Sequence, residues 1–383
     1  MKKTLLAAAL TVGFFGVAQA ETSVTLYGIV DVGVGYQKVS GSSSRVGGRA
    51  GNNLDSKRIG LVQDFQNGNR WGLKGSEDLG DGLRAVFVLE SGFTISDGQQ
   101  AQGGRLFGRQ ATLGLAGDSW GQLDFGRQTN ITSKYFVAID PFGAAFNQAN
   151  VGAAFTAANT VRYDNMVMYQ SPNFSGFQFG AGYSFNADGK EQWDKDVTIG
   201  GTKYNNKDLN KRAVTTGLRY ANGPVNVALT YEQMKAGNPA DNVTLKSWNL
   251  GGAYDFEVVK VSLAFGQTRN GLFGAQTFGD VSGVPQTFVG QRGLKVNSYL
   301  VGATAPIGNG KLMASWHMAD PRSAPDAAPG NFEYDKQQGY SLGYIHNLSK
   351  RTTVYAIGSY VKHVHFLPDA KATLFAVGLR HAF

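Results

Sequence analysis

The sequence contains no cysteine, only 10 prolines among 383 residues, and no long apolar run after its first twenty residues. Without cysteine the chain has no disulfide, no thiol nucleophile and no cysteine-ligated zinc. A membrane-spanning helix needs about 20 consecutive apolar residues, so the sequence excludes a helical membrane protein. We also find no P-loop pattern for nucleotide phosphates.

The first twenty residues have the features of a secretory signal. Lys2 and Lys3 supply a positive start, residues 5–17 are almost wholly apolar, and Ala18-Gln19-Ala20 is a small-residue cleavage site. The apolar run is too short to anchor the chain in a bilayer. We therefore expect a cleaved signal peptide over residues 1–20 and an exported chain over residues 21–383.

The charge balance is basic but dispersed. The formal net charge is +8, and removal of Lys2 and Lys3 leaves 34 basic and 28 acidic residues, or +6. A basic excess favours an anionic surface, anionic solutes or nucleic acid. Export and the absence of a clustered basic run argue against nucleic acid, so a surface or small anions remain.

Alternation with a period of two residues dominates the exported part. It recurs over residues 24–36, 177–185, 225–232 and 259–266, where apolar residues alternate with Gly, Ser, Asn or charged residues. Alternate side chains of a strand point to opposite faces. The apolar face ends in Tyr, Phe or Trp, which is typical of a lipid-facing band with aromatic girdles around a polar lumen.

The connections between these segments alternate in length. Seven short polar turns lie near residues 77–82, 116–121, 171–176, 221–224, 255–258, 305–310 and 347–351. Eight long segments lie near residues 37–56, 94–104, 128–160, 186–210, 233–246, 267–297, 319–337 and 363–371. Fifteen connections join sixteen strands, the even number expected of an outer-membrane barrel with short periplasmic turns and long external loops.

Closure of the barrel follows from the cost of unpaired backbone groups in hydrocarbon, several kcal/mol each. The first strand, from about Ser23, must therefore pair with the last, which ends at Phe383. Sixteen strands enclose an aqueous channel. The sequence thus predicts an all-β protein with one domain, a 16-stranded antiparallel transmembrane β-barrel.

Several motifs resemble one family. They are residues 23–31 (SVTLYGIVD), 70–79 (RWGLKGSEDL), 80–90 (GDGLRAVFVLE), 126–128 (GRQ), 140–143 (DPFG), 169–177 (YQSPNFSGF), 348–352 (LSKRT) and 377–383 (VGLRHAF). In this order they resemble the general porins of β-proteobacteria, of the neisserial and Burkholderia type. Residues 57–69 depart from that pattern and resemble an extra partial strand before Arg70.

The resemblance implies a homotrimer of 16-stranded barrels whose third external loop folds into the lumen. It also implies a constriction with acidic residues on one side and a basic cluster on the opposite wall, corresponding here to Arg70, Arg109 and Arg162. The residues expected to form the pore constriction are Arg70, Lys74, Arg84, Glu90, Arg109, Asp140 and Arg162.

Alternation supports most of this set. Arg70 and Lys74 fall on the inward face of one strand, and Arg84 and Glu90 on the inward face of the next. Arg109 is the exception, because it shares the parity of apolar residues in its strand. It reaches the lumen only if a bulge intervenes or the strand ends before it.

The inward loop, roughly residues 129–160, contains one acid, Asp140, and one base, Lys134. So little acid opposite an arginine wall predicts a positive field and a weak to moderate anion preference. We therefore expect a general diffusion porin for small hydrophilic solutes and ions. The alternative is a substrate-specific porin for a small anionic or polar solute, which phenylalanines in the loop leave open.

A third hypothesis is an enzyme or adhesin built on a barrel scaffold. We do not favour it, and we expect no enzymatic activity, cofactor or metal site. His363 and His365 are two residues apart, but no third ligand accompanies them, so a solvated pair is favoured over a metal site. The expected location is the outer membrane of a Gram-negative bacterium, in contact with outer-membrane lipid and lipopolysaccharide.

The last strand alternates apolar residues and ends in Phe383. This pattern resembles the C-terminal signal that the outer-membrane insertion machinery reads. We expect Phe383 to act as that assembly signal.

Overall fold

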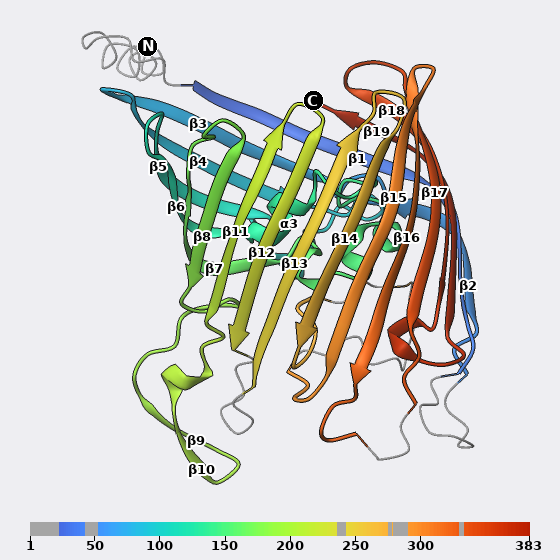
Figure 1. Ribbon diagram of the computed structural model, residues 1–383. Coiled ribbons are helices and arrows are strands. Elements are labelled where there is room, and N and C mark those ends of the chain that lie inside the picture. The colour runs from blue at the N-terminus through green and yellow to red at the C-terminus, as the bar shows by residue number, and fades with distance from the viewer. Residues whose placement is uncertain (1–22, 43–52, 236–242, 275–277, 279–289, 329–332) are drawn as a thin grey trace, which may run out of the picture.

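The computed structural model describes residues 23–42, 53–235, 243–274, 278, 290–328 and 333–383. Within them, long antiparallel strands run between short turns at one end and long loops at the other (Figure 1). The signal peptide expected over residues 1–20 lies outside the described residues. No helix among the described residues has the length and apolar character needed to cross a membrane.

The barrel strands are β1 (Ser23–Ser40), β2 (Ser56–Gln63), β3 (Arg70–Gly80), β4 (Leu83–Gly92), β5 (Gln110–Gly117), β6 (Gly121–Thr129), β7 (Arg162–Gln170), β8 (Phe177–Ser184), β11 (Ala213–Asn222), β12 (Val225–Lys235), β13 (Thr244–Asp255), β14 (Lys260–Arg269), β15 (Lys295–Ile307), β16 (Gly310–Ser323), β17 (Gln337–Asn347), β18 (Thr352–Lys362) and β19 (Lys371–Ala382). An external hairpin consists of β9 (Asp196–Ile199) and β10 (Thr202–Asn205). The helical turns are α2 (Ala101–Gly104), α3 (Ile131–Phe136), η1 (Asn147–Ala149), η2 (Val151–Ala153), η3 (Thr156–Ala158), η4 (Asn206–Leu209) and η5 (Val364–Phe366).

The barrel closes through the two ends of the chain. Strand β1 pairs with β19 in antiparallel register from Ile29 opposite Ala382 to Ser40 opposite Lys371. Two further backbone hydrogen bonds of 3.1 Å join Gly28 and Phe383 in both directions. No edge of the sheet is therefore left at this seam, as hydrocarbon demands.

The predicted sixteen strands are confirmed, with one strand in two pieces. Both β2 and β3 pair with β1: Gln63 lies opposite Val32, and Arg70 lies opposite Ile29. They form one barrel strand interrupted by residues 64–69, which we call the β2–β3 excursion. The partial strand expected over residues 57–69 is thus the outer half of the second strand, followed by this excursion.

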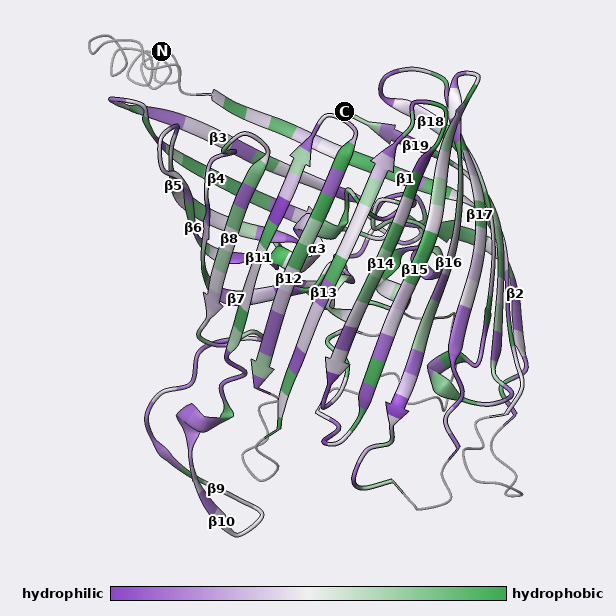
Figure 2. Ribbon diagram, in the orientation of Figure 1, coloured by the Kyte–Doolittle hydropathy of each residue, from purple (hydrophilic) through white to green (hydrophobic). Residues whose placement is uncertain are grey.

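Alternation separates two faces of the wall, as bands of hydropathy along the strands show (Figure 2). Large apolar side chains of one parity are exposed on the outside, among them Leu26 (59 %), Leu113 (64 %) and Phe375 (58 %). Side chains of the other parity point inward. Many are small or polar, and larger apolar ones such as Leu300 and Leu374 are buried in clusters with residues of the inward loop. The outward band is where lipid replaces water.

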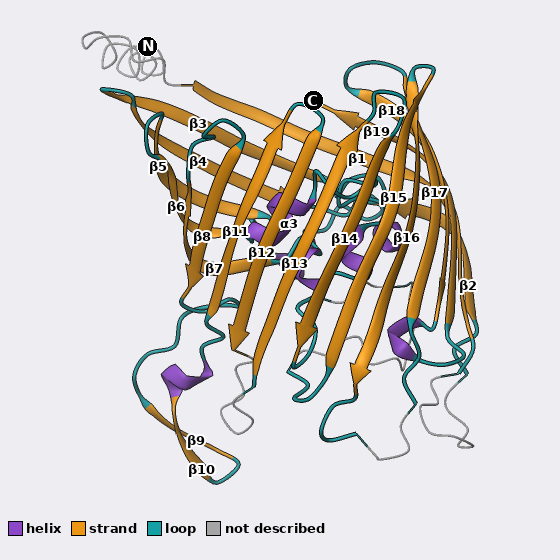
Figure 3. Ribbon diagram, in the orientation of Figure 1, coloured by secondary structure: helices purple, strands orange, loops and turns teal. Residues whose placement is uncertain are grey.

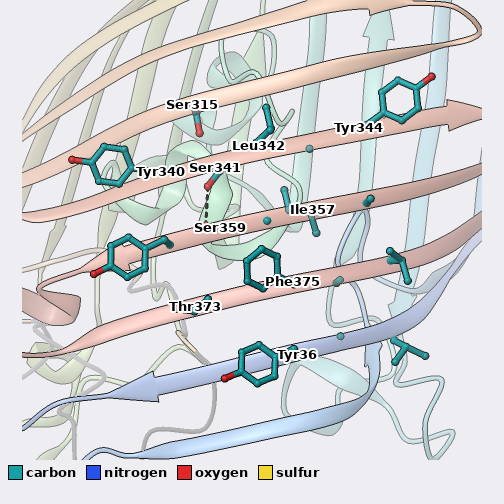
Figure 4. Close-up of a pocket in the computed structure, with 18 of the residues that line it drawn as sticks. Tyr36, Ser315, Tyr340, Ser341, Leu342, Tyr344, Ile357, Ser359, Thr373 and Phe375 are labelled. Carbon is teal, nitrogen blue, oxygen red and sulfur yellow. Dashed lines mark hydrogen bonds between the residues drawn. The ribbon is translucent and has the colours of Figure 1, made fainter.

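A hollow of about 1010 Å³ illustrates this outer face (Figure 4). It spans β1, β2 and β16–β19, with Leu342 and Phe375 at mid-height. Tyr36 and Tyr340 lie toward the long-loop end and Tyr344 toward the turn end. Aromatic residues therefore flank an apolar centre, the arrangement of a lipid-spanning barrel wall.

We predict that Gly28→Val impairs closure, because a Cβ at Gly28 collides with the ring of Phe383 and lies 2.8 Å from the carbonyl oxygen of Arg70. Overpacking of this kind costs about 1–3 kcal/mol. Refolding yield, read from the heat-dependent shift of the barrel on an SDS gel, should fall. Gly60→Val on β2 is the matched control, since a Cβ there meets nothing within 4 Å. Equal yields for both variants would contradict this account of the seam.

Candidate functional site: the pore constriction

The loop between β6 and β7 folds into the barrel, where α3 and short 3-10 turns lie inside the wall (Figure 3). Asn130 starts it: its side chain accepts a hydrogen bond from the Ser133 amide at 3.1 Å and donates one to the carbonyl of Ala157 at 2.9 Å. This is the helix N-cap contact that asparagine favours. The same side chain therefore also ties the start of the loop to its end.

Glycines in the wall let the loop lie flat against β8 to β17. A Cβ at Gly180 would come within 2.5 Å of Ile131, and one at Gly251 within 3.1 Å of Ile139. Gly302 faces Pro141, and Gly343 faces Phe142, with similar lack of space. The loop thus lies along glycine backbone on one side of the lumen, and Phe146 packs further on against Phe65 of the β2–β3 excursion and Tyr355 of β18.

A buried carboxylate anchors the loop to the wall. Glu232 on β12 is fully buried and accepts hydrogen bonds from the Thr132 hydroxyl at 2.8 Å and the Tyr163 hydroxyl at 3.1 Å. It also accepts one from the hydroxyl of Thr215. Because these three hydroxyls come from the start of the loop, the strand that follows it and the neighbouring wall, Glu232 fixes both ends of the loop to the wall.

The structure corrects the placement of Asp140 on the pore surface. Only 5 % of Asp140 is exposed, and its carboxylate accepts the backbone amides of Phe142 (3.0 Å), Ala144 (2.8 Å) and Val151 (3.0 Å). Burial raises the pKa of Asp140 to about 6, although the three amides oppose that rise. Its carboxylate organises the loop from within, and the loop presents no acid of its own to the lumen in the described residues.

Arginines gather on the opposite wall. The Nε of Arg109 donates to Glu90 at 2.8 Å, and Nη1 of Arg70 lies 4.0 Å from the same carboxylate. Tyr27 donates a further hydrogen bond to Glu90 at 3.0 Å. Glu90 is thus shared between two guanidinium groups. Asp64 of the β2–β3 excursion also lies within electrostatic reach of Arg70 and Arg109.

Arg162, at the start of β7, joins the same cluster. Its guanidinium is repelled by those of Arg109, Arg127 and Arg70 and attracted by Glu90. Its Nε is buried and has no hydrogen-bond partner among the described residues. The three arginines that the resemblance pointed to therefore lie together in space.

Arg109 faces this cluster because β5 begins one residue later, at Gln110. The Arg109 amide still bonds to the carbonyl of Glu90 at 3.2 Å, but the side chain is not bound by the alternation of the strand. Of the two possibilities that the sequence left open, the strand boundary is the one observed.

Arg84 lies apart from the cluster, whereas Lys74 lies beside Tyr27, which donates to Glu90. Arg84 pairs with Asp118 at 2.8 Å beside the short turns, six residues from Glu90 along β4, which is roughly 20 Å. The expectation that Arg84 helps form the constriction is therefore not supported. Lys74 is exposed on β3, with its ammonium 5.6 Å from the ring centre of Tyr27.

Two features of this wall were missed from the sequence. Arg380 of β19 lies close enough to Arg70 for mutual repulsion. The β2–β3 excursion packs into the barrel: Asp31 accepts the Asn67 amide at 2.5 Å and the Tyr355 hydroxyl at 2.7 Å. The carbonyl of Gly68 accepts from Nε of Arg70 at 2.8 Å, which orients that guanidinium. Residues so far apart in sequence gave no local signal of this contact.

Features of enzyme or metal chemistry do not converge in the described part of the chain. Residues 117–121 match the pattern Gly-x-Ser-x-Gly, but they form the turn between antiparallel β5 and β6, whereas the catalytic motif needs a strand-to-helix turn. No group of three or more His, Asp or Glu side chains is arranged for a metal within the described residues. His363 instead contacts the Lys336 carbonyl at 3.0 Å.

Comparisons with known proteins agree on one family. A family model described as Gram-negative porin matches residues 6–364. The chain is 54 % identical to an outer membrane porin protein of Bordetella pertussis over the full length of both. It is 32 % identical to outer membrane porin protein 32 of Delftia acidovorans, over 95 % of this chain and 90 % of that protein. Among solved structures, an anion-selective porin from Comamonas acidovorans superposes with a TM-score of 0.68 at 29 % identity, over 95 % of this chain and all of that one.

We predict that the contribution of Asp140 to the free energy of unfolding decreases as the pH rises from about 4 to about 6. Its folded-state pKa is about 6, above the unfolded value, so the native state binds the proton more tightly and loses that advantage across this window. The effect is at most roughly 3 kcal/mol. Urea unfolding midpoints at pH 4 and pH 7 should differ more in the wild type than in Asp140→Asn. Asp118→Asn, at an exposed site, is the control; an unchanged pH difference in Asp140→Asn would refute the assignment.

Proposed function

The chain belongs to the Gram-negative porin family, and from that premise we propose that the arginine cluster gives its channel a weak to moderate preference for anions. The protein is an outer-membrane porin and not an enzyme. Small hydrophilic solutes and ions would cross it by passive diffusion. The uneven pairing of charges at the constriction carries the proposal.

Acids near the cluster are largely engaged. Glu90 is divided between Arg70 and Arg109, and Asp164 is held by Arg127 at 2.6 Å and by Arg105 at 2.9 Å. Asp64 of the β2–β3 excursion lies within electrostatic reach of Arg70 and Arg109 and accepts the Asn69 amide. Arg162 and Arg380 have no ion pair with a described acid within 4.0 Å. Guanidinium groups stay ionised and are weakly hydrated, so a passing anion meets fixed positive charge at the narrow level.

The solved relative from Comamonas acidovorans is described as anion-selective, which supports the same preference here. The alternative of a substrate-specific porin rested on phenylalanines in the inward loop. Phe136, Phe142, Phe146 and Phe155 are each at most 3 % exposed. Because they pack against the wall, they do not line a path for solute, and general diffusion is favoured.

We also propose that the chain is exported, inserted into the outer membrane and assembled as porins are. We infer a homotrimer, as in the trimer form recorded for the fold neighbour OmpT of Vibrio cholerae. A signal peptide over residues 1–20 would direct export. Phe383 would be read by the outer-membrane insertion machinery, and outer-membrane lipid and lipopolysaccharide would surround the barrel. Phe383 directly follows β19 and is exposed, which supports that role.

The test is the zero-current potential of the purified protein in a planar bilayer under a KCl gradient. We predict a potential of the sign for chloride preference. Arg70→Gln with Arg162→Gln should lower the chloride-to-potassium permeability ratio by up to about fivefold per charge, since a charge a few ångströms from an ion is worth about 1 kcal/mol in a water-like dielectric.

Glu90→Gln should act in the opposite direction, because it removes the shared acid and leaves Arg70 and Arg109 unbalanced. Arg84→Gln is the matched control, as it removes the same charge roughly 20 Å away along the strand and should change the ratio little. A potassium-side potential in the wild type, or an equal effect of Arg84→Gln, would reject the assignment of selectivity to this cluster.

A further inference from the structure

Three cationic side chains stand side by side on the outer face of the barrel at its long-loop end. Lys246 of β13 lies opposite Arg269 of β14, and Arg269 lies opposite Lys295 of β15. Lys246 and Arg269 are exposed, and Lys295 is half-buried. Neighbouring strands are about 4.8 Å apart, so the charges span roughly 10 Å. We call this set the outer cationic row.

The row has no counter-charge from the described protein. Like charges directly opposite each other destabilise a sheet, and no described carboxylate lies within 4.0 Å of the three groups. Asp320 on the adjacent strand β16 is already paired with Arg322 at 3.2 Å and Lys336 at 3.5 Å. An anion from outside the chain would remove the repulsion along the row.

Arg269 is held in a defined direction within the row. Its Nε donates to Oε1 of Gln267 at 2.8 Å, and Gln267 in turn donates to Asn297 at 2.9 Å. Among the described residues no acceptor engages its two Nη groups, which leaves them for an outside acceptor. A planar guanidinium with two parallel donors fits the oxygens of a phosphate better than chloride or a single carbonyl.

Aromatic rings lie directly below the row, toward the turn end. Trp248 contacts Phe265 with ring centres 5.4 Å apart, and Phe265 contacts Tyr299 at 5.1 Å, on the same three strands. Such a girdle marks the boundary between headgroups and hydrocarbon. A lysine or arginine at that level costs only about 0–1 kcal/mol, so the row belongs at the headgroups of the outer leaflet.

An apolar groove of about 480 Å³ continues from the girdle down the outer wall. Leu250, Leu263 and Val301 line it, and Gly252 leaves its floor open. From Lys246 to Gly252 is six residues, roughly 20 Å along a strand, or about 14 Å in depth at a tilt of ~45°. That depth is about one leaflet of a bilayer whose hydrocarbon is ~30 Å thick.

We propose that β13, β14 and β15 form a binding site for a phosphorylated lipid of the outer leaflet. The outer cationic row holds the phosphate, and the groove below Trp248, Phe265 and Tyr299 receives an acyl chain. Charge complementarity selects the head, and the vertical order of cations, aromatic rings and groove selects a molecule with a phosphate at one end and hydrocarbon at the other. Channel conduction through the lumen does not depend on this outer site.

The experiment measures lipid retention by the purified full-length protein in detergent, using native mass spectrometry with diphosphorylated lipid A as the probe. Lys246→Gln, Arg269→Gln and Lys295→Gln together should weaken retention about 10- to 100-fold, since each surface cation contributes about 1 kcal/mol toward an anionic lipid. The control replaces Lys190, Lys203 and Lys207 by Gln, an equal loss of charge in the external loop between β8 and β11 that should leave retention unchanged.

A second variant tests the groove independently of charge. Gly252→Phe fills it, and a Cβ at Gly252 meets no atom closer than 3.6 Å, so the barrel should fold normally. We expect weaker retention of lipid A in this variant and in the wild type when the phosphates of the lipid are removed. Equal retention by the row variant and its control, full competition by inorganic phosphate, or undiminished retention by Gly252→Phe would each overturn the lipid site.

Discussion

The whole structure depends on one constraint, that every backbone amide and carbonyl facing hydrocarbon must be paired. Pairing of β1 with β19 and the reciprocal bonds between Gly28 and Phe383 satisfy it at the seam. The constraint acts on the outside only. The second strand is interrupted at residues 64–69, where the excursion packs inward against Asp31 and Tyr355. A closed wall can therefore tolerate irregular backbone where polar groups of the lumen bond it.

The lumen is divided by the loop between β6 and β7. Glycine backbone gives this loop a trench on β8 to β17, and Glu232 and Asp140 hold it with hydrogen bonds from buried donors. Both side chains are engaged in these hydrogen bonds. Asp140 is the only acid of the loop, so among the described residues the loop presents no negative charge to the channel. Arg70, Arg109 and Arg162 on the other wall are then opposed by acids of the wall, Glu90 and Asp64, and not by the loop. Loop anchoring and selectivity are in this way parts of one arrangement.

The outer face is set by the same alternation of side chains, but its residues are mainly apolar. Large apolar residues are exposed along the strands, and tyrosines flank them toward both ends of the barrel. Within that regular surface, the register that brings Lys246, Arg269 and Lys295 into line is set entirely by hydrogen bonding between strands. A shift of one residue in any of the three strands would turn the cation of that strand into the lumen. The outer cationic row therefore depends on the strand register as well as on the residue types.

The sequence by itself determined the barrel, its sixteen strands, its inside and outside faces and its seam, because these follow from alternation, turn spacing and the cost of an open edge. It placed Arg70 and Glu90 correctly on the inward face for the same reason. It could not decide the direction of Arg109, the burial of Asp140, the separation of Arg84 from the cluster, or the approach of Arg380 to Arg70. These features depend on how an irregular loop packs and on which residues of distant strands lie at the same height in the barrel. Contacts between residues far apart in the chain produce no periodic pattern in the sequence, so they could not be predicted from it.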